Sequence, residues 1–242
     1  MTSEPLFGEF IPSRKRPLEG GPVTIAVGFR YDDGLLLCAD TQYTGQIKFR
    51  GSKILAKSYA DGSKSAFVII GNLRYARMCV NLYEEMVEGT PAPECTLSKM
   101  KQLLISCVRE LHHGHIFKHP RRDDITVQFL IGLWSAKTKG DVAFLSTEDT
   151  SVIRCYGYDC LGSGEMLAQQ YIRPKYRRIT DITQRPRHSE DFVRRLAVTA
   201  LNNVKKYDAF CGYDSEYLTI TNEGVMSKVQ KLNLSPKSPK KK

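Results

Sequence analysis

The order in which strand-like and helix-like segments follow one another is the feature that most restricts the fold of this chain. Two β-like runs in the text VTIAVGFRYDDGLLLCAD meet at Asp32-Asp33-Gly34, and Asp-Gly between apolar runs is a strong hairpin signal. Residues 65–71 (SAFVIIG) form a third run that is apolar throughout, as expected for a strand covered on both faces. The first part of the chain therefore predicts a block of strands.

A pair of helices is expected next. Residues 72–89 have a helical pattern that ends at Gly89 and Pro91. Residues 96–118 repeat apolar side chains at i, i+3 and i+4, which gives one apolar face along a helix. We expect the two helices to pack together.

The second half repeats this order. The expected strands are 125–134, 141–147 and 151–160, followed by a helix from Gly164, a helix after Ser189, and final strands at 216–221 and 225–230. Strands and helices in separate blocks indicate segregated layers rather than alternating β-α-β units. We therefore predict an α+β fold, a four-layer αββα sandwich of two stacked antiparallel sheets flanked by helices.

Length and charge suggest one large domain with two tails. The 242 residues are 41% hydrophobic, which is enough for one sizeable core, and we expect a leader-like segment at 1–23, a domain at 24–230 and a disordered tail at 231–242. The tail holds five lysines and no acid, so the net charge of +10 falls to +5 without it (10 − 5). We interpret the tail as solvated, with a polyanion, nuclear-targeting or docking role as the alternative, and expect no nucleic-acid partner.

Apolar runs and cysteines bear on the cellular compartment. The sequence has no apolar run of membrane-spanning length, and the first twenty residues lack the apolar stretch of a secretory signal. The seven cysteines are odd in number and form no C-x-x-C pair, so neither a disulfide framework nor a zinc ribbon is indicated. We expect a cytoplasmic protein with no membrane partner, with the nucleus possible in a eukaryote, and with reduced core cysteines.

A histidine-rich segment at 111–124 (LHHGHIFKHPRRDD) was considered as a metal site. Its candidate ligands are His112, His113, His115, His119, Asp123 and Asp124. His115 and His119 would share one face if the helix continued that far, but Gly114 and Pro120 interrupt the pattern. We expect a solvated helix end whose imidazoles favour the negative end of the helix dipole, and no metal or other cofactor.

Several motifs, in order along the chain, resemble the proteasome β-subunit family, which belongs to the N-terminal-nucleophile hydrolases. The resemblance runs from about Thr24 to Val229. The motifs are the hairpin ending in Asp40, Lys53 in GSKI, Gly71 in IIG before a helix, CLGSGEMLAQQYI at 160–172 and YDAFCGYDSEYLTI at 207–220.

The resemblance implies a catalytic role for each of these positions. Thr24 would be the nucleophile, with its own α-amine as base once the Val23-Thr24 bond is cut. Lys53 would be a fixed cation that favours the alkoxide, and Asp40 would hold that lysine in place. The backbone N–H of Gly71 would donate to the oxyanion, while Ser163 and Asp208 would orient the amine and the nucleophilic water.

Each of these residues also has a structural interpretation that involves no chemistry. Thr24 would be a strand residue favoured by its β-branch, and Asp40 with Lys53 would be an exposed ion pair that contributes little. The other three would serve the backbone: Gly71 as a turn position, Ser163 as a helix N-cap and Asp208 as a loop turn residue.

The function implied by the resemblance is a threonine-type peptidase within a multimeric ring. Its partners would be other proteasome-type subunits, and its substrates unfolded protein or peptides cut through an acyl-enzyme. The alternative is a catalytically silent structural subunit, because Val23 stands where the family has glycine and Pro22 precedes it. A hydrolase of small amides in the same superfamily is a third interpretation. The retained order of Asp40, Lys53 and Gly71 favours an active enzyme.

Overall fold

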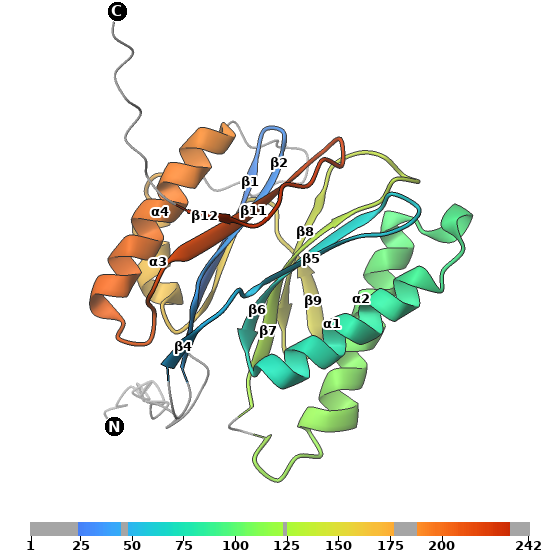
Figure 1. Ribbon diagram of the computed structural model, residues 1–242, viewed down its shortest axis with the longest axis horizontal. Helices are drawn as coiled ribbons and strands as arrows, with labels where there is room; N and C mark the ends of the chain where they lie inside the picture. Colours follow the sequence, from blue (N-terminus) through green and yellow to red (C-terminus); the bar gives the residue numbers. More distant parts are fainter. Residues whose placement is uncertain (1–23, 45–47, 123–124, 177–187, 233–242) are drawn as a thin grey trace, which may run out of the picture.

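The computed structural model describes residues 24–44, 48–122, 125–176 and 188–232. The predicted leader at 1–23, Asp123 and Asp124, and most of the predicted tail therefore lie outside the described residues. The described chain folds into four layers, with a helical layer on each outer side of two stacked antiparallel sheets (Figure 1). The predicted four-layer α+β sandwich is confirmed.

The first sheet has the strand order β10-β1-β2-β11-β12. Its strands are β10 (Tyr158–Gly162), β1 (Ile25–Tyr31), β2 (Gly34–Asp40), β11 (Ser215–Thr221) and β12 (Gln230–Lys231). In the β1–β2 hairpin Tyr31 is opposite Gly34, so Asp32 and Asp33 form the turn. The hairpin is where the sequence predicted it, but Gly34 lies in the strand, where a Cβ would come within 2.2 Å of the Ile220 carbonyl oxygen.

The second sheet has the strand order β5-β6-β7-β8-β9. The hairpin β3–β4 comes directly after β2 along the chain and forms a separate two-stranded sheet. The strands are β3 (Gln42–Thr44), β4 (Lys48–Arg50), β5 (Ile54–Ser58), β6 (Lys64–Gly71), β7 (Val127–Trp134), β8 (Ala143–Glu148) and β9 (Ser151–Arg154). Sequence analysis missed β3, β4 and β5. The first two have only three residues each. In β5 only Ile54 is buried, and the residues after it are partly exposed or exposed, so there is no long apolar run.

Four α-helices cover the sheets in the described chain. Helices α1 (Leu73–Glu88) and α2 (Leu97–Glu110) pack on the second sheet, and α3 (Glu165–Ile172) and α4 (Glu190–Tyr207) pack on the first (Figure 1). Ser189 is the N-cap of α4, as predicted, and its side chain accepts from the Phe192 N–H. A short 3-10 helix (Ala92–Glu94) connects α1 to α2.

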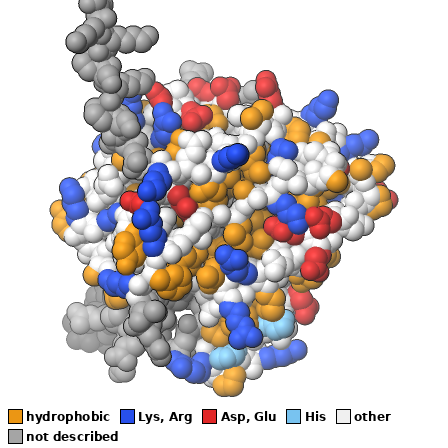
Figure 2. All heavy atoms as spheres, viewed as in Figure 1, with side chains coloured by type: hydrophobic (Ala, Val, Ile, Leu, Met, Phe, Trp, Pro, Cys, Tyr) orange, Lys and Arg blue, Asp and Glu red, His pale blue; other side chains and the backbone are white. Residues whose placement is uncertain are grey.

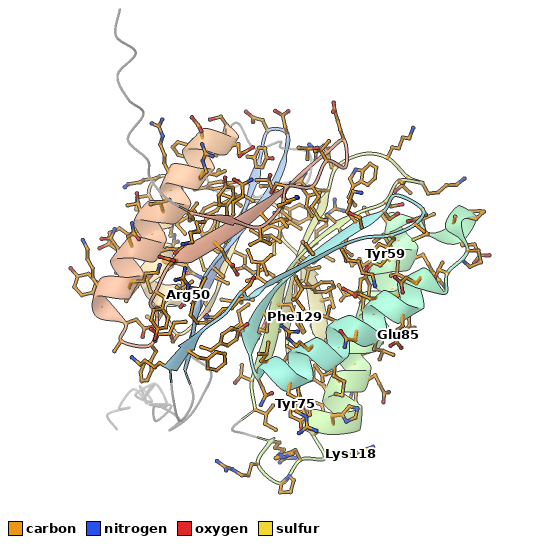
Figure 3. All side chains as sticks on the ribbon, in the orientation of Figure 1. Arg50, Tyr59, Tyr75, Glu85, Lys118 and Phe129 are labelled. Atoms are coloured by element: carbon orange, nitrogen blue, oxygen red, sulfur yellow. The ribbon has the colours of Figure 1, made fainter. Side chains whose placement is uncertain are left out.

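The apolar core has three parts, one between each pair of adjacent layers. Every residue of β1 is buried, because its alternate side chains face α3 and α4 on one side and the second sheet on the other. Phe129 of β7 packs in the core between the second sheet and its helices (Figure 3). The sheets contact each other at Gly28, where a Cβ would lie 2.4 Å from the Phe144 ring.

Two predicted strands differ from the structure. Residues 151–160 were expected as one strand, but β9 ends at Arg154 in the second sheet and β10 begins at Tyr158 in the first. The three intervening residues cross between the sheets, and the β-like pattern of residues 151–160 does not reveal this change. The last predicted strand, 225–230, is reduced to a single bridge at Met226 and the short β12.

Two residues of the predicted tail belong to the folded domain. Lys231 of β12 pairs with Glu216 of β11, and the side chain of Leu232 is buried against the first sheet. Lys and Arg side chains are spread over this face of the molecule, including the region where β12 lies (Figure 2). Positive charge beside a short outer strand discourages edge-to-edge pairing with another sheet.

Candidate active site

Asp40, the last residue of β2, is the centre of a buried polar cluster. One carboxylate oxygen, Oδ1, accepts from the Thr24 hydroxyl at 2.6 Å, the Lys53 ammonium at 2.7 Å and the Ile25 N–H at 3.1 Å. The other, Oδ2, accepts from the N–H groups of Gln42 and Gly212 at 3.2 and 3.1 Å. Asp40 is completely buried, and this set of donors is what makes a buried carboxylate tolerable.

Lys53 reaches this cluster from the second sheet. It precedes β5, is 1% exposed, and its Nζ donates to both Asp40 and the Thr24 hydroxyl oxygen. The Tyr43 ring lies 5.2 Å from the same Nζ, close enough for a cation–π contact. Burial lowers the pKa of Lys53, and the charge of Asp40 opposes that effect. The exposed ion pair considered as an alternative for Asp40 and Lys53 is wrong, because both partners are buried.

Thr24 lies directly before β1, and its neighbourhood explains the Gly162-Ser163-Gly164 turn. Gly162 has φ +106°, and a Cβ there would lie 2.1 Å from the Thr24 carbonyl oxygen. A Cβ at Gly164 would lie 2.3 Å from a methyl group of Val204 in α4. Both glycines therefore let the turn pass close to Thr24 and to α4.

Ser163 and Asp208 meet beside the Thr24 backbone. The Ser163 hydroxyl donates to Asp208 Oδ2 at 2.6 Å and to the Thr24 carbonyl oxygen at 3.5 Å. Ser163 is not the N-cap of α3, because that position is Gly164 and no side chain caps the helix. Asp208 also accepts from the Phe210 N–H at 2.9 Å, so it forms the loop turn considered as its alternative role.

Gly71 ends β6 at the turn into α1, as expected. It has φ +106°, and a Cβ there would lie 2.0 Å from the Thr126 carbonyl oxygen, so the turn itself requires glycine. Within the described residues, the hydrogen bonds of Thr24 and Lys53 do not include Gly71. Its role as oxyanion donor is therefore still a prediction.

The polar cluster places a hydroxyl between a cation and a carboxylate in a site closed to bulk water. Thr24 is 2% exposed, and its Oγ both donates to Asp40 and accepts from Lys53. An alkoxide at this oxygen would be stabilised by the ammonium, since electrostatic interactions are stronger in a desolvated site. In the uncut chain the Thr24 nitrogen is an amide and has no basic lone pair, so a base for the hydroxyl would appear only after cleavage before Thr24.

Sequence analysis missed the residues that support this cluster from α4, from β11 and from the segment between them. Lys205 donates to the Tyr213 carbonyl and the Ser215 hydroxyl at 2.9 and 2.6 Å, next to the Gly212 N–H that binds Asp40. Glu216 in β11 accepts from the Lys53 N–H at 2.7 Å. One sequence signal was available: Glu216 is in phase with Leu218 and Ile220, which face the second sheet, so an acid occupies a position expected to be buried.

The histidine segment has a different structure from the one predicted. Helix α2 ends at Glu110, and Leu111–Ile116 form a π-helix, so His115 and His119 are not on one α-helical face. Their rings instead lie 6.5 and 6.4 Å from Tyr75, at the same end of the helical layer as Lys118 (Figure 3). Among the residues that the structure describes, no three His, Cys, Asp or Glu side chains are grouped to hold a metal ion.

All seven cysteines are unpaired, and all except Cys155 are fully buried. Burial raises the pKa of their thiols, to about 11 for Cys95 and Cys107 and to about 12 for Cys79 and Cys155. No helix in the described ranges is long and apolar enough to cross a membrane.

Comparison with known proteins gives matches by structure alone. No protein-family model matches the chain, and no curated protein sequence does. Anbu (ancestral beta-subunit) from Yersinia bercovieri is 14% identical over 88% of each chain, with a TM-score of 0.70. Anbu from Hyphomicrobium sp. strain MC1 (14% identity, TM-score 0.66) and the helical assembly of the Anbu complex from Pseudomonas aeruginosa (13%, 0.68) also match over 88% of each chain.

These matches correct the family expected from the sequence. The resemblance to the proteasome β-subunit family is wrong as an assignment, because the similar structures are Anbu proteins, which are proteasome-like but form a distinct family. At 12–14% identity, the likeness establishes the fold alone. The glycines that suggested the family are required by close contacts within this fold, with backbone at Gly71 and Gly162 and with the Val204 side chain at Gly164. They therefore indicate the architecture rather than the family.

Proposed function

We propose that this chain is a subunit of a proteasome-related assembly and hydrolyses peptide bonds with Thr24 as nucleophile, after cleavage of the Val23-Thr24 bond. The observation that carries the proposal is the buried contact of the Thr24 hydroxyl with both Asp40 and Lys53. The assembly is proposed from the fold shared with Anbu, one structure of which is described as a helical assembly. The unpaired cysteines support an intracellular location as part of this proposal.

The proposed reaction proceeds through an ester. The freed α-amine of Thr24 takes the hydroxyl proton, and Oγ attacks the substrate carbonyl carbon while Lys53 stabilises the negative charge on Oγ. The Gly71 N–H donates to the resulting oxyanion. The ammonium of Thr24 then gives its proton to the leaving amine as the peptide C–N bond breaks. Water hydrolyses the acyl-enzyme and restores the hydroxyl, while Ser163 and Asp208, beside the Thr24 backbone, hold the amine in place.

A silent structural subunit is the second candidate, and the residues before Thr24 favour it. Val23 is β-branched and Pro22 is rigid, so the bond that must be bent and cut is stiff. In that case Asp40 and Lys53 would only join the two sheets.

A small-amide hydrolase would differ in being monomeric, which size-exclusion chromatography of the purified chain distinguishes from an assembly.

The peptidase proposal is tested by substitution at Thr24 with a matched threonine control. Thr24→Ala removes the nucleophile, and we expect complete loss of hydrolysis of fluorogenic peptides. Thr41→Ala is the control, because Thr41 is also buried and is next to Asp40, but its hydroxyl donates to the Asp214 carbonyl. Hydrolysis that survives Thr24→Ala would exclude Thr24 as nucleophile, and equal loss in both variants would indicate a structural effect.

A further inference from the structure

Glu216 joins the first sheet to the backbone of Lys53. It lies in β11 opposite Ala39, and its neighbour Ser215 is opposite Asp40. Its Oε1 accepts from the Ser52 hydroxyl at 2.7 Å, the Lys53 N–H at 2.7 Å and the Ile54 N–H at 3.3 Å. Glu216 is 8% exposed, so these three donors replace most of its hydration.

The two sheets are thus linked twice at the same residue. The Lys53 side chain extends from the second sheet to Asp40 and Thr24 in the first. The Glu216 side chain extends in the opposite direction, from the first sheet to the main chain of Lys53. A lysine has four rotatable bonds in its stem, so the position of Nζ depends on a fixed backbone. The Lys53 carbonyl is fixed by the Ile69 N–H at 2.9 Å, and Glu216 fixes the N–H side.

We propose that Glu216 is the positioning residue of Lys53, which holds the ammonium against the Thr24 hydroxyl. This inference rests on the proposed function for its catalytic consequence, but the position and charge of Lys53 can be measured without it. The side-chain hydrogen bonds of Glu216 are with Ser52, Lys53 and Ile54, so Glu216 acts on the Thr24 hydroxyl through Lys53.

Glu216 also contributes negative charge near the ammonium. Burial lowers the pKa of Lys53, and the charges of Asp40 and Glu216 and the nearby Cys211 thiol raise it. Lys205 is a cation that faces the same cluster, and the charge of Lys53 contributes to the lowered pKa of Lys205. The Tyr43 ring lies 5.2 Å from Nζ on the side of β3. Removing the charge of Glu216 therefore lowers the pKa of Lys53.

The surroundings of Glu216 allow its replacement without collapse of the fold. A cavity of about 180 Å³ adjoins Glu216, Ser52 and Thr41, with Arg50 and Lys231 among its lining residues. A polar cavity of this size can admit water, which would bind the Lys53 and Ile54 N–H groups if the carboxylate were removed. Glu216→Ala is therefore expected to fold while it loses the fixed backbone.

Two substitutions separate geometry from charge. Glu216→Gln keeps an acceptor oxygen and removes the charge, and Glu216→Ala removes both. Glu223→Gln is the control, because it removes one exposed negative charge from the turn after β11. The first measurement is the titration of Lys53 in the full chain by NMR with ¹³C-labelled lysine, with the Lys53 signal assigned from its loss in Lys53→Arg.

We expect a lower pKa of Lys53 in Glu216→Gln than in the wild type, and no change in Glu223→Gln. An unchanged titration in Glu216→Gln would overturn the electrostatic part of the inference. This result does not depend on catalysis, so it distinguishes failure of the inference from failure of the proposed function.

The second measurement is peptide hydrolysis by the same variants. We expect kcat to fall about 10²-fold in Glu216→Ala with little change in KM, and to recover partly in Glu216→Gln, because a small displacement of a catalytic group has a cost of this order. A wild-type kcat in Glu216→Ala would overturn the positioning role. If the wild type itself hydrolyses no peptide, the proposed function fails. The NMR titration still decides whether the charge of Glu216 raises the pKa of Lys53.

Discussion

Besides the Gln42 N–H two residues away, Asp40 accepts from donors of three other segments: the start of β1, the residue before β5 and the loop before β11. Its ion pair with Lys53 is buried, and such a pair is strongly destabilised when one partner is removed, because the other charge is left without compensation. At the residue scale, this carboxylate is therefore both a structural connection and the electrostatic support of Thr24.

Replacement of Asp40 by asparagine tests this dual role. Asp40→Asn is expected to destabilise the protein by about 3–5 kcal/mol, since it leaves the Lys53 ammonium unpaired. Urea unfolding followed by circular dichroism measures the change. Asp214→Asn is the control, because Asp214 pairs with Arg50 at an exposed position, where a loss of about 0–1 kcal/mol is expected. Equal losses of stability in the two variants would show that the buried pair stabilises the protein no more than the exposed pair does.

The pH dependence of the Asp40→Asn variant has a definite sign. Without the Asp40 charge, the pKa of Lys53 is lowered further below its ordinary 10.5, because only the weaker influences of Cys211 and Glu216 still oppose burial. Between the lowered pKa and 10.5, the unfolded chain binds this proton more tightly than the folded chain does, so stability rises with pH. The free energy of unfolding of Asp40→Asn should therefore come closer to that of the wild type as pH rises from 7 to 9. A difference that stays constant over this range would contradict this explanation.

At the scale of elements, one close contact between the sheets joins β1 to β8. Gly28 of β1 faces Phe144 of β8, and glycine is needed there because a side chain would occupy the space of the ring. The stacked arrangement of the two sheets therefore depends on one small residue opposite one large one, a packing of the kind found in close-packed cores.

Gly28→Ala should overpack this contact and cost about 1–3 kcal/mol in the free energy of unfolding. Thermal and urea unfolding measure the loss, and Phe144→Leu in the same chain should restore part of it. Gly89→Ala is the control, because Gly89 has φ −74° at the end of α1, a conformation that alanine adopts. A Gly28→Ala protein as stable as the wild type would show that the sheets can move apart at this point.

The elements also show why sequence alone predicted the layers but not all of the site. The hairpin, the helices α1 and α4 and the four layers follow from local periodicity. The contacts that complete the site join residues far apart in sequence, such as Glu216 to Lys53 and Gly212 to Asp40. Nothing in local spacing specifies such pairs, and the change of sheet between β9 and β10 is equally invisible in the β-like pattern of residues 151–160.

For the molecule as a whole, the buried cysteines predict a loss of stability in alkali. Burial keeps their folded-state pKa values above the ordinary value of 9.0, so the unfolded chain releases these protons first. A raised folded-state pKa gives stability that is present below pH 9 and lost above it, by up to about 1.4 kcal/mol per pH unit for each thiol. Urea unfolding at pH 8, 9, 10 and 10.5 should show this fall, and Cys38→Ala should reduce its slope. A flat profile would contradict it.

The central claim for the whole molecule is that the polar cluster around Thr24 serves a freed N-terminal nucleophile. The most direct test is the intact mass, with the N-terminal residue, of the protein purified from its native host. We expect a chain that begins at Thr24, since only then does the threonine have the amine that its hydroxyl requires. A chain that retains Val23 would contradict the claim and would leave Thr24, Asp40 and Lys53 as a buried structural link between the two sheets.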